Sequence, residues 1–459
     1  MAAFAETLSI SRITRAIRER GVNRSIFQAA VSVSAAGVVV KIIATCKEIT
    51  VAGVYGRSDA MDAFLAAALI PNLLINLISE SMNQALVPTL IRVREREGQE
   101  HAQQLLSSSM LWLCLLLGSA SVAMALCAHG FFPLIASHFP VAKLALSIRL
   151  FYGLLPVVLI TGIATNCTAV LNTFDRFALP ALAPVAISVS IIAGTLLLSG
   201  RLGIWAMVYS TLAGALIHAG VVAGMMNRHG YRLRLHWYGM NEATREVAHQ
   251  YGPVLLSGVV SSGGLLVDQA MAAMLSPGSV STLVYAGRFV GVVVTLLAGA
   301  VATAVVPYFS RMIAHEDWAG CRHTLRTWVG VTALVSTPIA VALVCCSHLV
   351  IRVALQHGAF GPHDTAVVTP VLAMYAIQIP FYVSVRVLNR FLVAMRRTDL
   401  IFYCGALNLV LDVVLNLVLM RRFGVAGIAL STSLWTVSSF LFLAYWSWRV
   451  LPRAASGTK

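Results

Sequence analysis

Charged residues are scarce in this chain. Asp, Glu, Lys and Arg make up 11% of its 459 residues, whereas 58% are hydrophobic. A soluble protein carries about 25% charged residues. This scarcity, together with a mean hydropathy of +0.82, excludes an ordinary soluble domain. We therefore expect an all-α polytopic membrane protein.

Patterns that bind metals are also missing. The eight cysteines are scattered without the paired spacing of a zinc site, and the histidines lie mostly in loops. We therefore expect no metal and no cofactor, and reduced thiols that fill space. The first residues lack the apolar core of a cleavable signal peptide. Residues 1–24 are instead predicted to form a basic cytoplasmic N-terminal segment.

Long apolar runs are abundant, and a spanning helix needs roughly 20 such residues. We predict about 12 transmembrane helices, near residues 27–55, 61–91, 104–128, 146–171, 179–199, 203–226, 249–275, 280–309, 325–349, 366–394, 400–419 and 424–447. Basic residues outside these segments concentrate on alternate loops, which the positive-inside rule assigns to the cytoplasm. This pattern accounts for the net charge of +15 without a nucleic-acid partner. It predicts a multi-pass protein of a bacterial inner membrane with both termini cytoplasmic.

The two halves of the chain repeat. A Val-Pro pair closes the second segment at residues 87–88 and the eighth at 306–307, and residues 203–211 align with 424–432. These matches occur in order and at nearly one spacing, which indicates two pseudo-symmetric halves.

The repeat predicts two six-helix lobes, residues 25–227 and 247–459. A basic cytoplasmic linker, residues 228–246, joins them. Parallel repeats of this kind place the substrate site between the lobes.

Polar side chains interrupt the second segment at a regular spacing. Asn72, Asn76, Glu80 and Gln84 recur every four residues, with Asn83 beside them. At this spacing the polar side chains form one stripe along a helix. Contact with lipid alone would not stabilise such a stripe. We interpret the stripe as the wall of a water-filled chamber.

Ionisable residues in the first segment favour the same interpretation. Ionisable groups at membrane depth cost several kcal/mol each and persist where they face a cavity or one another. Lys41 and Glu48 are seven residues apart, so they fall on nearly the same helix face. They therefore either line the chamber or pair to hold helices together.

Other charged residues have simpler expected roles. Asp62 stands near a helix start, where capping is its expected role. Asp268 and Asp412 lie in the seventh and eleventh segments and are candidates for ion coupling. Arg386 and Arg390, near the inner end of the tenth segment, are expected to reach the membrane interface.

The stretch GRSDAMDAFLAAALIPNLLINLISESMNQALVP, residues 56–88, resembles the MviN/MurJ family of lipid-linked oligosaccharide flippases. Further matches follow in the family's order, at RFALPALAP, LVDQAMAAMLSPGSVSTLVYAGRF, ALQHGAFGPHDTA and RVLNRFLVAMRRT. The resemblance covers most of the chain. It implies a MATE-like fold of the multidrug/oligosaccharidyl-lipid/polysaccharide (MOP) exporter type, and a transporter rather than an enzyme. The implied activity moves an undecaprenyl-pyrophosphate-linked sugar, typically the peptidoglycan precursor lipid II, to the outer leaflet by alternating access.

The resemblance also implies which residues form the site. Lys41, Lys47 and Glu48 fall on charged family positions, with Lys in place of Arg and Glu in place of Asp, whereas Asp62 and Arg288 match directly. We expect Lys41, Lys47 and Arg288 to bind the pyrophosphate. Glu48, Asp62 and the Glu80 carboxylate would balance the positive charge, and Asp62 and Asp268 are the candidates for charge balance or gating. The amides Asn72, Asn76, Asn83 and Gln84 would hydrogen-bond the sugar.

The chain departs from the family pattern at several positions. Ile75 and Asn76 stand where the family has arginines, Gly287 stands where it has an acid, and two further C-terminal spans of typical members have no counterpart. Lysine binds phosphate as a point charge without the planar fork of Arg. A flippase for another polysaccharide precursor and a transport-inactive scaffold for cell-envelope synthesis proteins therefore remain open.

Two other classes have distinct sequence requirements. A multidrug/cation antiporter of the same fold would need a net acidic chamber. A membrane enzyme acting on the same lipid carrier would need a large outer loop with clustered acids or histidines, whereas the outer loops here are short.

Overall fold

A computed structural model describes residues 36–173, 178–314, 317–395 and 397–451, and within these ranges every regular element is a helix. One helix covers residues 36–55. The others are α2 (Asp59–Leu74), η1 (Ile75–Ser79), α3 (Glu80–Glu97), α4 (Gln99–Ile135), α5 (Val141–Asn172), α6 (Ala178–Leu182), α7 (Val185–Leu202), α8 (Trp205–Arg228), α9 (Glu242–Ala273), α10 (Ser279–Ala314), α11 (Trp318–Cys345), α12 (Ser347–Leu355), α13 (Pro362–Ala376), α14 (Ile379–Ala394), α15 (Thr398–Phe423) and α16 (Val425–Val450). The predicted N-terminal segment 1–24 and the start of the first predicted span lie outside the described residues.

Ten helical segments of the described chain are long and apolar enough to cross a membrane. They coincide with ten of the twelve predicted spans. The other two predicted spans coincide with the helix at 36–55 and with α9, whose first turns are polar. The all-helical membrane fold is therefore confirmed, and the chain is an integral membrane protein.

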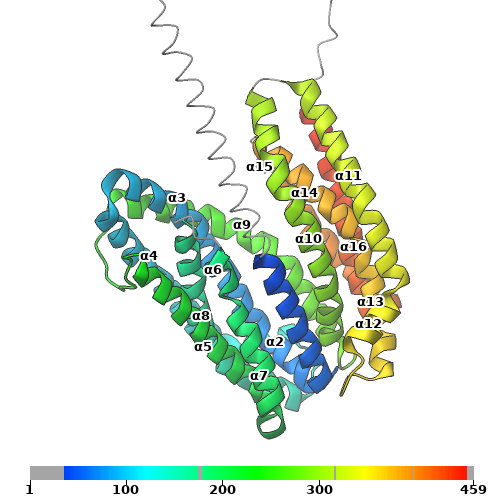
Figure 1. Cartoon of the computed structure of the whole chain (residues 1–459). Helices are drawn as coiled ribbons and strands as arrows, with labels where there is room; N and C mark the ends of the chain where they lie inside the picture. Colours follow the sequence, from blue (N-terminus) through cyan, green and yellow to red (C-terminus); the bar gives the residue numbers. More distant parts are fainter. Residues whose placement is uncertain (1–35, 174–177, 315–316, 396, 452–459) are drawn as a thin grey trace, which may run out of the picture.

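The helices form two groups. In the first, α7 packs on α8, and α5 packs on α2, α4 and α8; in the second, α15 packs on α16, and α10 and α11 pack on α14. The ribbons of the two groups lie close together at the lower end of Figure 1 and diverge toward the upper end. This arrangement is the two-lobe organisation that the repeat predicts.

The turns that join α7 to α8 and α15 to α16 show the repeat in the backbone. Gly203 ends α7 with φ 56° and ψ −134°, and Gly424 ends α15 with φ 56° and ψ −133°. Positive φ is readily adopted by glycine because it has no Cβ. The aligned glycines therefore build the same helix–helix corner in each half.

Helix α9 contacts both groups. Near its start, Glu246 pairs with Arg92 of α3, and Gly258 lies against Leu77 of η1. Farther along, Gly263 lies against Leu409 of α15. The predicted lobe boundary at residue 247 therefore falls within a helix that both groups share, and it stays a prediction.

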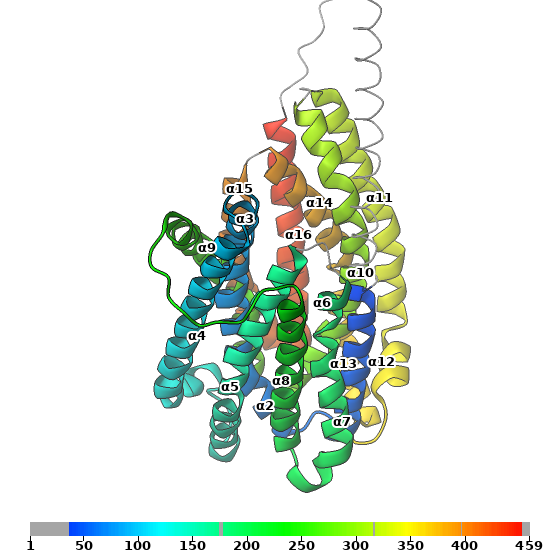
Figure 2. The same cartoon turned by 60° about the vertical axis from the view of Figure 1, so that its left-hand side comes forward.

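The loop between α8 and α9, residues 229–241, is fixed to α4 (Figure 2). The Gln103 side chain donates a hydrogen bond to the Arg232 carbonyl at 2.8 Å and accepts one from the Arg232 N–H at 2.9 Å. Farther along, the Tyr238 N–H donates to Ser108 Oγ at 3.2 Å, and the Trp112 and Trp237 rings lie 6.1 Å apart.

Tyr231 is buried at the start of this loop, and burial raises the pKa of its phenol although Arg94 lowers it. The phenol is therefore uncharged at neutral pH.

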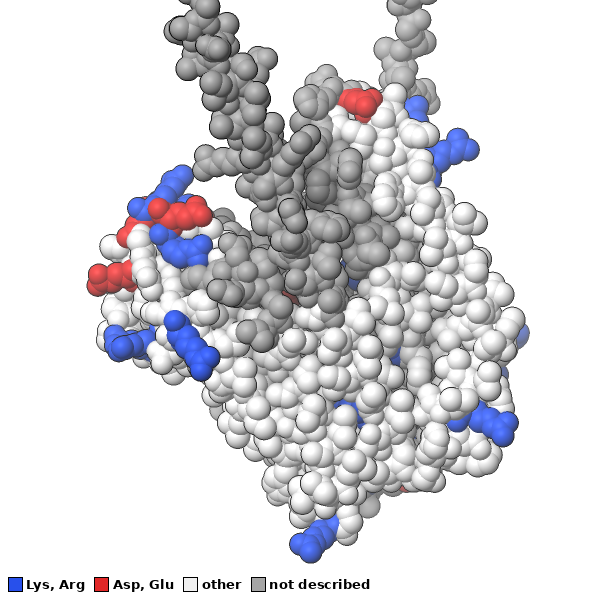
Figure 3. Space-filling model, in the orientation of Figure 1, with Lys and Arg blue, Asp and Glu red and all other residues white. Residues whose placement is uncertain are grey.

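The charged surface follows the membrane orientation of the helices. In Figure 3 most of the visible Lys, Arg, Asp and Glu atoms lie near the upper and lower ends, and the surface between carries few of them. An uncharged band of this kind is the surface that lipid chains contact.

Candidate functional site

Three charged side chains meet between the helix at 36–55 and α10. Lys47 Nζ lies 2.9 Å and Arg288 Nε lies 3.2 Å from the same oxygen, Glu48 Oε1. Glu48 is buried, whereas 60% of the Arg288 side chain is exposed. Two cations share one carboxylate, so the group carries a net positive charge and presents an accessible guanidinium.

The structure thus brings together Lys47, Glu48 and Arg288, three of the residues predicted to form the site. Lys41 lies two helical turns before Glu48 and lines a cavity of the C-terminal group of helices. The carboxylate that was expected to face Lys41 instead has Lys47 and Arg288 as its ion-pair partners. The role of these residues in substrate binding stays a prediction.

The polar stripe is exposed. Asn72, Asn76, Glu80 and Gln84 all have exposed side chains, whereas Asn83 is buried. Asn76 itself lies in η1, a π-helical turn between α2 and α3, which holds more residues per turn than an α-helix. The four-residue spacing therefore does not continue on one unbroken α-helical face. Within the described residues, no hydrogen bond or ion pair joins the stripe to Lys47 or Arg288.

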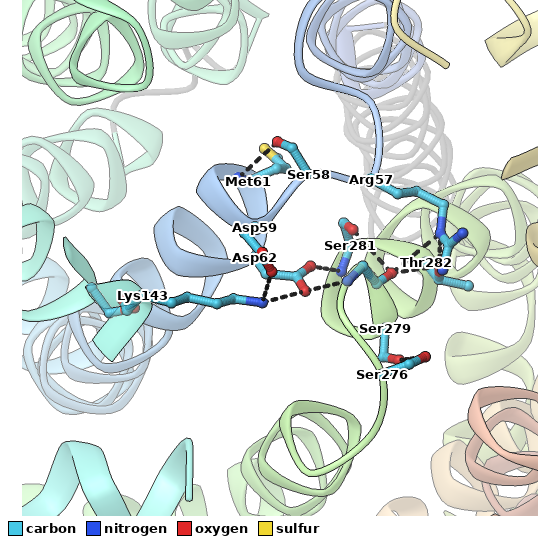
Figure 4. A network of polar contacts seen from close by, with 12 residues as sticks. Arg57, Ser58, Asp59, Met61, Asp62, Lys143, Ser276, Ser279, Ser281 and Thr282 are labelled. Atoms are coloured by element: carbon cyan, nitrogen blue, oxygen red, sulfur yellow. Dashed lines mark hydrogen bonds and ion pairs between the residues drawn. The ribbon is translucent and has the colours of Figure 1, made fainter. Parts of the chain in front are cut away.

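Asp62 lies at a junction of the two groups of helices rather than in a chamber (Figure 4). Its carboxylate accepts hydrogen bonds from the N–H groups of Gly278 at 2.6 Å and Ser281 at 2.9 Å, at the start of α10. Lys143 Nζ of α5 lies 3.0 Å from Asp62 Oδ2, and both side chains are buried. Asp62 therefore caps α10, a helix of the other lobe, whereas Ser58 caps its own helix α2.

Arg57 makes a second connection beside the first (Figure 4). Its Nε donates to Thr282 Oγ1 at 2.6 Å and to the Gly278 carbonyl at 3.3 Å. Its Nη1 lies 3.3 Å from Asp364 Oδ1 at the start of α13. We call this cluster the latch; it consists of Arg57, Asp62, Lys143, Gly278, Ser281, Thr282 and Asp364.

The latch was not predicted. Arg57 and Lys143 were given no site role, and Asp62 was expected to cap its own helix or to serve in charge balance or gating. A signal was nevertheless present, because two acids at Asp59 and Asp62 stand one helical turn apart beside a basic residue. Lys143 Nζ indeed lies 2.7 Å from Asp59 Oδ1 as well.

Asp268 and Asp412 form a buried pair in the C-terminal group. The Asn416 amide donates to Asp268 Oδ1 at 2.8 Å and to Asp412 Oδ1 at 3.2 Å, and the Thr432 hydroxyl donates to Asp268 Oδ2 at 3.1 Å. One amide therefore bridges the two buried carboxylates, and the ion-coupling role expected for them stays a prediction. No cluster of three metal-ligating side chains occurs in the described chain.

This pair lies on the wall of a cavity of about 610 Å³ between the helix at 36–55 and α9, α10, α13, α14, α15 and α16. The polar side chains on its wall are Lys41, Asp268, Tyr375, Gln378, Tyr382, Arg386, Asn389, Asn408, Asp412, Thr432, Trp435, Thr436 and Ser439. Arg386 donates a hydrogen bond to the Tyr382 hydroxyl and stacks over its ring. The Arg386 side chain is exposed, and the expectation that it reaches the membrane interface stays a prediction.

Comparison with known proteins gives the family. A family model described as lipid II flippase MurJ matches residues 51–458. The lipid II flippase MurJ of Burkholderia cenocepacia is 27% identical over 378 residues, which cover 79% of this chain and 72% of that protein. A probable lipid II flippase MurJ of Buchnera aphidicola is 24% identical over 419 residues, which cover 90% of this chain and 82% of that protein.

Solved structures show the same fold. A lipid II flippase MurJ in an inward closed conformation superposes with a TM-score of 0.78 at 23% identity, covering 90% of this chain and 87% of that one. An inward-facing multidrug resistance MATE transporter of the MOP superfamily superposes with a TM-score of 0.75 at 11% identity, covering 93% of this chain and 100% of that one. With the family model matching most of its length, the chain belongs to the lipid II flippase MurJ family.

Proposed function

We propose that this chain moves lipid II from the inner to the outer leaflet of a bacterial cytoplasmic membrane, with both termini in the cytoplasm. Family membership supports the activity, and the Lys47–Glu48–Arg288 cluster is the observation that carries the mechanism. The lipid II headgroup is attached to its tail through a diphosphate, which is anionic. A net positive cluster with an accessible guanidinium attracts such an anion.

The surroundings strengthen this attraction. At about 4 Å, two unit charges interact by about 1 kcal/mol in water but by about 4 kcal/mol at the effective dielectric constant of a protein surface. Arg288 also offers a planar fork of donors that matches phosphate oxygens. Glu48 orients both cations in the empty state, and a diphosphate would replace it as their partner.

The latch supports alternating access. The lobes are joined at the end where Asp62 bonds to α10, and the positive-inside rule assigns this end to the outer side of the membrane. Opening toward the outer leaflet would require these bonds to break. The latch is therefore the outer gate in this proposal.

The Asp268–Asp412 pair provides a means of driving the cycle. A proton or cation that enters it moves through part of the membrane potential, which contributes about 2.3 kcal/mol per charge per 100 mV. Because α9 carries Asp268 and contacts both groups of helices, charging of this pair acts on the element that links the lobes.

A second candidate substrate is another lipid-linked saccharide. The observations that favour it are Ile75 in η1 and Gly287 on the cavity wall, where the resemblance implies arginine and acid. Residues at these two positions would contact the saccharide part of the headgroup. The Lys47–Glu48–Arg288 cluster would contact its diphosphate.

Complementation tests the proposal. The chain is expressed in a bacterium depleted of its own lipid II flippase, and growth and outer-leaflet lipid II are measured. The wild-type chain should restore both, and Arg288→Ala should restore neither. Arg201→Ala, which removes an exposed basic side chain at the end of α7, is the matched control and should behave as wild type. Full rescue by Arg288→Ala would remove Arg288 from the mechanism, and failure of the wild-type chain would favour the second substrate.

A further inference from the structure

We propose that the 610 Å³ cavity of the C-terminal lobe binds the saccharide of the lipid-linked substrate. The inference rests on the proposed function and assigns the sugar to a different lobe from the exposed asparagines of α2 and η1. The diphosphate would remain at Lys47 and Arg288, outside this cavity.

The wall of the cavity carries the side chains that recognise sugars. Tyr375, Tyr382 and Trp435 provide aromatic faces, on which the C–H groups of a pyranose ring pack. The amides of Gln378 and Asn389 can both donate to and accept from hydroxyl and N-acetyl groups. Aromatic surfaces with a few directed polar groups are typical of small-molecule sites, whose volumes are about 300–1,000 Å³.

Two polar atoms on this wall need a partner. Trp435 Nε1 and Asn389 Oδ1 are buried, and neither has a hydrogen-bond partner among the described residues. Leaving a buried donor or acceptor unsatisfied costs about 1–3 kcal/mol. One donor and one acceptor on one wall suit a ligand that carries both hydroxyl and carbonyl groups, as an N-acetylated sugar does.

The cavity is also next to the diphosphate cluster. Gly287 lies on its wall, and the next residue, Arg288, pairs with Glu48. Lys41, on the same helix as Lys47 and Glu48, lies on its wall too. The first sugar of the substrate is bonded directly to the diphosphate, so a diphosphate at Arg288 would place that sugar at this cavity.

Two glycines of α10 leave the wall open. A Cβ on Gly291 would meet no atom within 4 Å, and one on Gly287 would meet only Tyr375 at 3.8 Å. A larger side chain at Gly291 would therefore occupy the cavity without displacing the protein. Replacing a helical glycine also favours the helix, so Gly291→Leu is a plug that should leave the fold intact.

The test compares two lipids that share a tail and a diphosphate. Lipid II carries the saccharide and undecaprenyl diphosphate does not; binding of each to the purified full chain is measured by native mass spectrometry titration. The wild type should bind both. Gly291→Leu and Trp435→Phe should weaken lipid II binding by about tenfold or more, the change expected when a stacking contact or hydrogen bonds are lost. Undecaprenyl diphosphate binding should not change in either variant.

Two control variants complete the experiment. Gly220→Leu, at an exposed position of α8 where a Cβ would also meet no atom within 4 Å, should leave both lipids unaffected. Arg288→Ala should weaken both. Equal effects of Gly291→Leu on the two lipids, or no effect on lipid II, would overturn the saccharide site while leaving the proposed function intact. If the wild-type chain binds neither lipid, the proposed function fails and this inference fails with it.

Discussion

Replacing Asp62 by Asn tests the latch with the smallest change in shape. The carboxylate accepts from two backbone N–H groups of the other lobe and faces Lys143, all within 3.0 Å. An amide of the same size keeps one acceptor oxygen but turns an NH2 group toward one of these donors. We therefore expect the Asp62→Asn variant to open the outer gate more readily.

The magnitude follows from the contacts. Hydrogen bonds to charged groups contribute about 1.5–3 kcal/mol each and neutral ones about 0.5–1.5 kcal/mol. Lys143 keeps Asp59 as a partner in the variant, so no buried charge is left alone. Weakening these two bonds should destabilise the closed conformation relative to the open one by about 2–4 kcal/mol. This change shifts the closed-to-open ratio by roughly 30- to 1,000-fold.

Distances between spin labels measure this shift. Labels at Leu197 of α7 and Val353 of α12 are exposed and lie on different lobes. They are introduced as cysteines after replacement of the native cysteines. The wild type should give one short distance, and Asp62→Asn should add a longer one. Asp59→Asn is the control, because Asp59 is 58% exposed and an exposed ion pair contributes about 0–1 kcal/mol. Identical distance distributions for Asp62→Asn and wild type would refute the gating role of the latch.

Two further variants probe how the chain is held together. Gly358→Ala should lower the thermal unfolding temperature, because Gly358 has φ 60° and a Cβ would collide with the Gly53 carbonyl. Gly361→Ala is the control and should leave the unfolding temperature unchanged, because a Cβ has room there. Equal melting curves for the two variants would contradict the argument. Gln103→Ala should speed protease cleavage of the loop at residues 229–241, because both bonds to the Arg232 backbone are lost. Gln104→Ala is the control for that measurement, and equal cleavage rates would show that the Gln103 bonds do not hold the loop.

The spans and the charged residues of the first helix could be predicted because each depends on local sequence, whereas the pairing of Glu48 with Arg288 was not predicted. Apolar length locates most spanning helices, and the cost of a buried ion marks Lys47 and Glu48 as residues that need partners. The resemblance to the family supplied Arg288 as a candidate. Its contact with Glu48 is then the simplest way to satisfy both charges.

The latch and the cavity could not be predicted in this way. Asp62 and Gly278 are 216 residues apart, and the bond uses backbone N–H groups, which every sequence has. The cavity is built from seven helices, and Trp435 or Asn389 alone is indistinguishable from an ordinary core residue. The chamber-wall role of the stripe stays a prediction, and its four-residue spacing could not reveal η1, which interrupts the α-helix.

Helix α9 is fixed at both ends, to α3 through Glu246 and to α15 through Asp268 and its Asn416 partner. A rotation of one lobe against the other must therefore be absorbed within α9 or break one of these attachments. The part between Gly258 and Gly263 is where the contacts of α9 change lobe, and Pro253, which donates no backbone hydrogen bond, precedes it. This short hinge would set both the axis and the largest angle of the rocking motion, so lengthening or stiffening it would change how far each side of the protein opens.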